Sequence, residues 1–169
     1  MKGYSKITSL ERSKHNKYNA NIELEHLKLE LCHGRTNHAR HFIDQYFFFK
    51  HGYVNRNGNA DWEKIVWTGN VSLEAELEKD RSQVVKEHSV PIKVIRNMLF
   101  EHSEGKNIST QSIADILDKY VHFATITKKE DKRLREAQLN STMPKGWCGL
   151  SGNVFARYKA VNIQILHVT

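Results

Sequence analysis

The sequence predicts an α+β fold, in which a mainly helical single domain carries a small antiparallel sheet. Three observations lead to this class. Apolar residues recur at helical spacing in several segments, two later segments are rich in β-branched residues, and glycines separate these stretches. At 169 residues with 39% hydrophobic side chains, the chain is long enough for one core. We divide it into a basic N-terminal arm over residues 1–20 and a single globular domain over 21–169.

The first twenty residues are predicted to be an arm because they are basic and show little apolar periodicity. Several Lys and Arg residues stand against a single acid, Glu11, and Tyr4 and Tyr18 lie among them. Such an arm follows phosphates by charge and stacks on bases through its rings, although a solvated basic terminus has the same composition. The strong helix formers of 21–31 then predict a helix, which Gly34 ends.

A second helix is expected from Thr36 or Asn37, both good N-cap residues, to His51 before Gly52. Its aromatic residues recur at i, i+4, i+7 and i+11, which indicates core packing rather than base stacking. After a loop rich in Asn and Gly, the segment 62–67 favours a short strand. The aromatic stripe consists of Phe42, Tyr46, Phe49 and Tyr53.

The middle of the chain is predicted to be helical. The charged segment 73–86 favours one helix, and 89–102, with Ser89 as its N-cap, favours a second. Ser109 or Thr110 is expected to cap a third helix that ends near residue 120.

The C-terminal part supplies the expected sheet. The β-branched and aromatic segment 121–127 predicts a strand, and Thr127 with Glu130 predicts the capping box of a helix over 128–139. After a loop and a short helix, the segment 161–168 alternates as a strand does, and we expect it to pair with 121–127.

Composition and charge narrow the class of partner. Lys and Arg number 26 against 19 Asp and Glu, which gives a net charge of +7 and points to nucleic acid as the partner. The absence of a long apolar run or a hydrophobic leader leads us to expect no membrane partner and a cytoplasmic location. Two cysteines are too few for a disulfide framework or a four-thiolate zinc site, so a metal would rely on His and carboxylates. Glycine motifs for nucleotide hydrolysis, dinucleotide binding or a serine nucleophile are absent.

The first candidate site is the segment Glu87-His88-Ser89-Val90-Pro91. It resembles the opening of the HNH-type nuclease motif over these five residues, and the remainder of the family pattern is not found. The resemblance implies that His88 acts as general base toward a phosphodiester, while Glu87 binds a divalent metal ion, Mg²⁺ or Mn²⁺. The alternative is structural: Ser89 caps a helix, Pro91 starts it, and the two preceding side chains end the previous element.

The second candidate site lies at the start of the second expected helix. His38, His41 and Asp44 follow each other at i, i+3, so that neighbouring members share one helix face and could hold a metal, with His41 as a further catalytic candidate. The spacing from Arg35 to His41 also resembles the Arg-x(4–6)-His motif of HEPN ribonucleases, which implies phosphate positioning by the Arg and base catalysis by the His. The alternative is a basic helix start, including Arg40, that contacts phosphate without cutting it.

The third candidate concerns binding. The segment 108–117 resembles the first helix of a helix-turn-helix pair, and the basic residues of 128–139 would then face nucleic acid. A solvated, ion-paired surface helix is the alternative. Arg157 adds basic surface near the C-terminus. The basic residues proposed for the reading helix are Lys128, Lys129, Lys132, Arg133 and Arg135.

The sequence therefore predicts a nucleic-acid-binding protein, with metal-dependent endonuclease activity as its candidate chemistry. Two alternatives stay open, a non-catalytic regulator or accessory protein that binds DNA or RNA, and a protein-interaction adaptor with an acidic partner. The sequence does not distinguish DNA from RNA, and it gives no oligomeric state.

Overall fold

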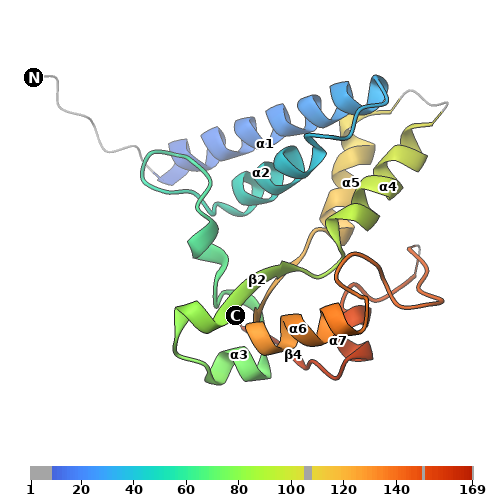
Figure 1. Ribbon diagram of the computed structural model, residues 1–169. Coiled ribbons are helices and arrows are strands. Elements are labelled where there is room, and N and C mark those ends of the chain that lie inside the picture. Colours follow the sequence, from blue (N-terminus) through green and yellow to red (C-terminus); the bar gives the residue numbers. More distant parts are fainter. Residues whose placement is uncertain (1–8, 105–107, 150, 169) are drawn as a thin grey trace, which may run out of the picture.

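The computed structural model describes residues 9–104, 108–149 and 151–168. Four helices gather on one side of the molecule, and a small sheet with three shorter helices occupies the other (Figure 1). The fold is a mainly helical α+β single domain, as predicted. The helices of the first side are α1 (Ser9–Cys32), α2 (Ala39–His51), α4 (Ile92–Ser103) and α5 (Thr110–Tyr120); those beside the sheet are α3 (Leu73–Leu77), α6 (Lys128–Glu136) and α7 (Ala156–Ala160).

The sheet has four strands in the order β2-β3-β1-β4 and is mixed rather than purely antiparallel. β3 pairs antiparallel with β2 and parallel with β1, and β1 pairs antiparallel with β4. The expected pairing of 161–168 with 121–127 is wrong, because β1 lies between these two strands. The strands are β1 (Gly69–Ser72), β2 (Val84–His88), β3 (Phe123–Thr127) and β4 (Ile165–Val168).

The core of the helical side forms where α1 packs on α2. Leu24, Leu27 and Leu31 are buried along one face of α1, and Ile43 and Phe48 are buried on α2. This spacing of i, i+3 and i+7 is the helical stripe expected for 21–31.

Helix α1 begins at Ser9, within the segment expected to be an arm. Residues 9–20 are helical and continue directly into the predicted helix, and Ala20 is buried. Residues 1–8 of the predicted arm lie outside the described residues. The basic side chains after position 8 are therefore held on a helix.

A second core lies between the sheet and the helices beside it. β3 is buried along its whole length, and its alternate residues Ala124 and Ile126 pack with Leu134 of α6 and Tyr158 of α7. The capping box of Thr127 and Glu130 starts α6 as predicted. No second helix of a helix-turn-helix follows α5, because the chain passes directly into β3.

Several predicted boundaries are wrong for local reasons. The segment 62–67 forms a 3₁₀ helix (Trp62–Ile65) rather than a strand, since the side chain of Asp61 caps it. Only the start of 73–86 is helical; the chain then enters a second 3₁₀ turn (Arg81–Gln83), and Val84 and Val85 pair in β2. β-branched residues favour the sheet once a partner strand is present.

Two predicted N-caps are also wrong. The residue before α4 is Pro91, while the backbone N–H of Ser89 donates to the carbonyl of His122. Helix α2 follows His38, which makes no side-chain cap, so neither Thr36 nor Asn37 caps it. The predicted Ser109 cap of α5 is present.

No helix in the described part of the chain combines the length and apolarity needed to cross a membrane.

Candidate functional site

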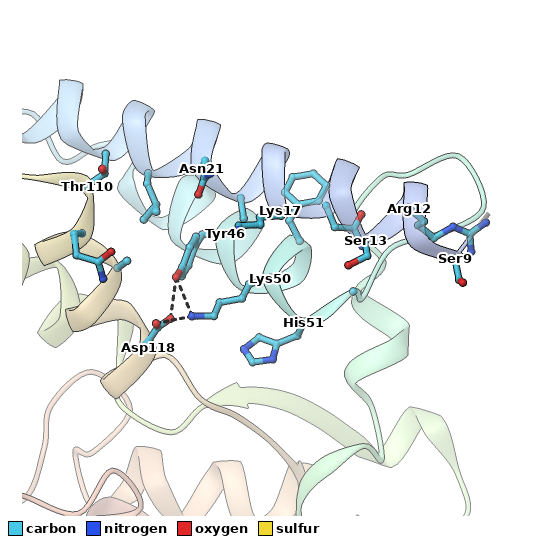
Figure 2. Close-up of a pocket in the computed structure, with 17 residues that line it drawn as sticks. Ser9, Arg12, Ser13, Lys17, Asn21, Tyr46, Lys50, His51, Thr110 and Asp118 are labelled. Atoms are coloured by element: carbon cyan, nitrogen blue, oxygen red, sulfur yellow. Dashed lines mark hydrogen bonds and ion pairs between the residues drawn. The ribbon is translucent and has the colours of Figure 1, made fainter. Parts of the chain in front are cut away.

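A cleft of ≈ 780 Å³ opens between α1, α2 and α5. Figure 2 shows Tyr46, Lys50 and Asp118 joined below α1, with Arg12 and Ser9 farther along the cleft at the start of that helix. Other residues that line it are Ser9, Arg12, Ser13, Asn16, Lys17, Asn21, Phe49, His51, Thr110 and Gln111.

Helical spacing places one polar wall on the cleft. On α1, Arg12 lies above Asn16 and Ser13 lies above Lys17, because residues four apart share a helix face. The next residues along this wall, Ala20 and Leu24, are buried and fix α1 against its neighbours. Gly52 ends α2 in the left-handed region at φ 72°, so the chain turns away beside the cleft.

A hydrogen-bonded triad occupies the centre of the cleft. The Tyr46 hydroxyl donates to Asp118 Oδ1 at 2.9 Å, and Lys50 Nζ donates to the same hydroxyl at 3.2 Å. Lys50 Nζ also lies 2.5 Å from Asp118 Oδ2. Burial and the Asp118 carboxylate raise the pKa of Tyr46 to about 12. Hydrogen bonds to Asp118 and Tyr46 raise the pKa of Lys50 against the opposing effect of burial, so Lys50 stays charged.

The charges of the cleft favour an anion. Asp118 is the single carboxylate among the described residues that line it, and it is already paired with Lys50. Arg12 and Lys17 are exposed, and neither forms an ion pair with any residue in the described ranges. Their charge is therefore available to a ligand, and phosphate oxygens are suitable acceptors for both.

The structure brings together His88, which is predicted for catalysis, and Asp44, which is predicted as a metal ligand. His88 at the end of β2 and Asp44 on α2 are both buried, and His88 Nε2 lies 2.8 Å from Asp44 Oδ1. The Phe123 ring packs beside His88, with ring centroids 4.2 Å apart. A carboxylate that accepts from one imidazole nitrogen fixes the tautomer of the ring.

Glu87 does not join this pair. Adjacent residues of a strand point to opposite faces, and the Glu87 carboxylate lies 2.5 Å from Arg157 instead. His38 and Arg35 both lie beside Glu30, at 3.6 and 3.2 Å.

The remaining predicted residues at the start of α2 are exposed. His41 lies beside the Phe42 ring, and Arg40 Nε lies 3.7 Å from Asp44 Oδ2. Within the described ranges no three His, Cys, Asp or Glu side chains come close enough together to hold a metal ion.

The prediction that Arg157 contacts nucleic acid is wrong, because its side chain is fully buried. Its guanidinium binds Glu87 and donates to the carbonyl oxygens of His88, Ser89 and Leu139. Arg157 thus joins β2 to the loop after α6, and none of it is left to reach a phosphate.

The basic face predicted on α6 is partly neutralised. Arg133 lies 2.7 Å from Glu74, and Lys132 lies 3.6 Å from Glu136. Lys128 and Lys129 are exposed at the helix start. This arrangement agrees with the solvated, ion-paired helix that the sequence left as an alternative.

The residues at the centre of the cleft were missed by the sequence analysis. Tyr46 belongs to the aromatic stripe that predicts core packing, and Lys50 and Asp118 carry no motif. One signal in the sequence points to the cleft: polar residues recur at helical spacing through 12–21, which extends the helix predicted from residue 21 toward the N-terminus.

Comparison with protein-family models, with curated proteins and with solved structures finds no match for this chain.

Proposed function

We propose that the protein binds nucleic acid through the cleft between α1, α2 and α5. The observation that carries the proposal is the charge of its lining: Arg12, Lys17 and Lys50 stand against one carboxylate, Asp118, which Lys50 already neutralises. An anionic backbone placed there gains two free cations without displacing an existing ion pair.

The size and lining of the cleft favour a single strand over a duplex. A cleft of ≈ 780 Å³ has the size of a small-ligand pocket and can hold a few nucleotide groups. Recognition of a duplex instead requires a protein element that enters a groove of the nucleic acid. The side-chain amides of Asn16, Asn21 and Gln111 lie beside the cations and can bond to sugars and base edges. Single-strand binders combine such a charged groove with aromatic rings.

Binding is tested with labelled single-stranded RNA, single-stranded DNA and duplex DNA, using fluorescence anisotropy. The double variant Arg12→Glu/Lys17→Glu is expected to weaken binding of single strands about tenfold or more, because it replaces two phosphate contacts by repulsion. The matched control, Lys128→Glu/Lys129→Glu on α6, makes the same change in net charge and is expected to have a small effect.

Three outcomes contradict the proposal. Equal losses in both double variants would mean that binding follows net charge alone. Preferential loss in the α6 variant would move the interface to that helix. Affinity that does not change with salt would exclude phosphate contacts and favour the adaptor alternative.

A second candidate function, metal-dependent phosphodiester hydrolysis, is favoured by the 2.8 Å contact between His88 and Asp44. A histidine oriented by a carboxylate has the arrangement of a general base or of a metal ligand. The test is nicking of plasmid and RNA with Mg²⁺, Mn²⁺ or chelator by the natural protein and by His88→Ala. Activity that needs the metal and is lost in the variant supports it, and unchanged nicking in the variant contradicts it.

A further inference from the structure

A second cavity, of ≈ 330 Å³, adjoins the cleft and shares Tyr46, Lys50, His51 and Asp118 with it. It continues toward the start of β1 and β3, where His122 forms part of its wall. Its volume lies at the lower end of the ~300–1,000 Å³ range of small-ligand pockets. A nucleic-acid strand lying in the cleft would therefore meet a side cavity lined by two imidazole rings.

His51 is the last residue of α2, and its ring lies on the same side as Lys50 and Asp118 (Figure 2). The Phe47 ring packs against it, with centroids 4.3 Å apart. Burial lowers the pKa of His51, and the charges of Lys50 and His122 lower it further, while Asp118 opposes them. The ring is therefore neutral near pH 7.

His122 lies between α5 and β3, with Nε2 3.1 Å from the carbonyl oxygen of Lys119. A carbonyl only accepts, so Nε2–H is the donor and Nδ1 of the neutral ring is unprotonated. Burial lowers the pKa of His122, the Lys119 carbonyl raises it, and His167 lowers it.

These groups match one kind of chemistry. A neutral imidazole accepts a proton, an imidazolium donates one, and the Lys50 ammonium stabilises an anion between them. No serine or cysteine is among the described residues that line this cavity, and the Thr68 hydroxyl already bonds to the backbone carbonyls of Lys64 and Ile65 in the preceding 3₁₀ helix. RNA carries its own nucleophile in the 2′-hydroxyl, so two histidines can cleave it without a nucleophile from the protein.

We propose that the cavity between α2, α5 and β1 cleaves RNA without a metal, with His51 and His122 as general base and general acid. This inference rests on the proposed nucleic-acid binding. One histidine removes the proton of a 2′-hydroxyl, whose oxygen bonds to the adjacent phosphorus. The bond from phosphorus to the 5′-oxygen breaks, and the other histidine protonates that oxygen. The products are a 2′,3′-cyclic phosphate and a 5′-hydroxyl, and no oxidant or cofactor is consumed.

The pH dependence of this step is constrained by the groups around the two rings. They are Lys50, Asp118, Tyr46 and Tyr53 in the cavity, and His167 on β4. The reaction needs one ring neutral and the other protonated, so the rate is greatest between the two apparent pKa values of the pair. Both values lie below the ordinary 6.5, so a bell-shaped profile with its maximum below pH 6.5 is expected.

The test uses the full chain, a chelator, and a short RNA with its DNA counterpart of the same sequence. RNA is expected to be cut to a cyclic-phosphate end, and DNA to stay intact because it lacks the nucleophile. His51→Ala and His122→Ala should each lower the rate by about 10²-fold or more while RNA affinity and thermal unfolding stay near those of the natural protein. His51→Gln and His122→Asn provide milder variants if an alanine variant fails to fold. The control is His33→Ala, because His33 is exposed in the loop between α1 and α2. This variant should cleave RNA at the rate of the natural protein.

The outcomes separate this inference from the proposal on which it rests. RNA binding without cleavage overturns the cleavage site and leaves the binding function in place, whereas absence of binding overturns both. Cleavage that is equal in the natural protein and both histidine variants overturns the assignment of the two residues. Cleavage that needs Mg²⁺ and disappears in His88→Ala transfers the activity to the Asp44 and His88 pair.

Discussion

Lys86 lies on β2 with its ammonium among aromatic rings. Nζ is 3.0 Å from the centroid of the Trp62 ring, 4.9 Å from that of Phe123 and 5.1 Å from that of Phe48. Burial lowers the pKa of Lys86 to about 8, although the Asp44 carboxylate opposes the shift. Attraction to the ring faces compensates only part of the lost hydration.

This shift predicts a pH dependence of stability. In the unfolded chain Lys86 titrates near 10.5, so between pH 8 and 10.5 the unfolded state binds more protons and the free energy of unfolding rises with pH. The expected gain is about 1–3 kcal/mol. Urea unfolding at several pH values should show this rise in the natural protein and lose it in Lys86→Met. Lys93→Met, exposed on α4, serves as control, and an equal slope in Lys86→Met would contradict the prediction.

Substitution of Arg157 is expected to lower the free energy of unfolding and to leave nucleic-acid affinity unchanged. Arg157→Met removes donors to three carbonyls and leaves the half-buried Glu87 without its cation. We expect a loss of about 3–5 kcal/mol in the free energy of unfolding. Arg56→Met, exposed in a loop, should change it by less than about 0.5 kcal/mol. Nucleic-acid affinity of the folded Arg157→Met protein should be unchanged, and weakened binding would restore Arg157 as a contact.

Among the elements, α5 carries Asp118 into the cleft and depends on its first turn. The Ser109 side chain accepts from the Ser112 backbone N–H at 3.1 Å and completes a capping box. Ser109→Ala is expected to cost about 1 kcal/mol of unfolding free energy, measured in denaturant. Ser151→Ala, an exposed loop serine, should cost much less. Equal effects of the two substitutions would mean that the cap does not stabilise α5.

The sequence correctly predicts those helix ends that are determined by neighbouring residues. The capping boxes at Ser109 and Thr127 and the glycine stop at Gly52 depend on residues within one turn, so α5, α6 and the end of α2 follow from the sequence. The four residues of β1 show no alternation, and their place between β3 and β4 depends on contacts far apart in the chain. Such pairing has no local pattern to reveal it.

The candidate sites also depend on contacts between residues that lie far apart in the chain. His88 and Asp44 belong to two separate predicted sites, and because their contact spans 44 residues no local pattern joins them. The cleft needs three helices to meet, so Lys17, Lys50 and Asp118 acquire a common role only in the folded chain. Arg157 was misjudged because charge alone does not reveal burial.

At the scale of the whole molecule, the net charge of +7 is unevenly available. Arg133 and Arg135 on α6 are paired with Glu74 and Asp131, so this helix offers less free charge than its sequence implies. The wall of α1 keeps Arg12 and Lys17 unpaired within the described ranges. Net charge therefore predicts attraction to a polyanion, whereas the pairing pattern predicts where contacts form.

This distinction predicts a measurable salt dependence. Each phosphate contact to a single strand contributes about −0.7 to the slope of log affinity against log salt concentration. If Arg12 and Lys17 each contact one phosphate, Arg12→Gln/Lys17→Gln should make the slope shallower by about 1.4. Lys128→Gln/Lys129→Gln removes the same charge from α6 and should leave the slope nearly unchanged. Titrations of one labelled strand at several salt concentrations measure both slopes. Equal changes of slope in the two double variants would contradict the prediction. They would show that nucleic-acid binding depends on the total charge of the protein and not on contacts in the cleft.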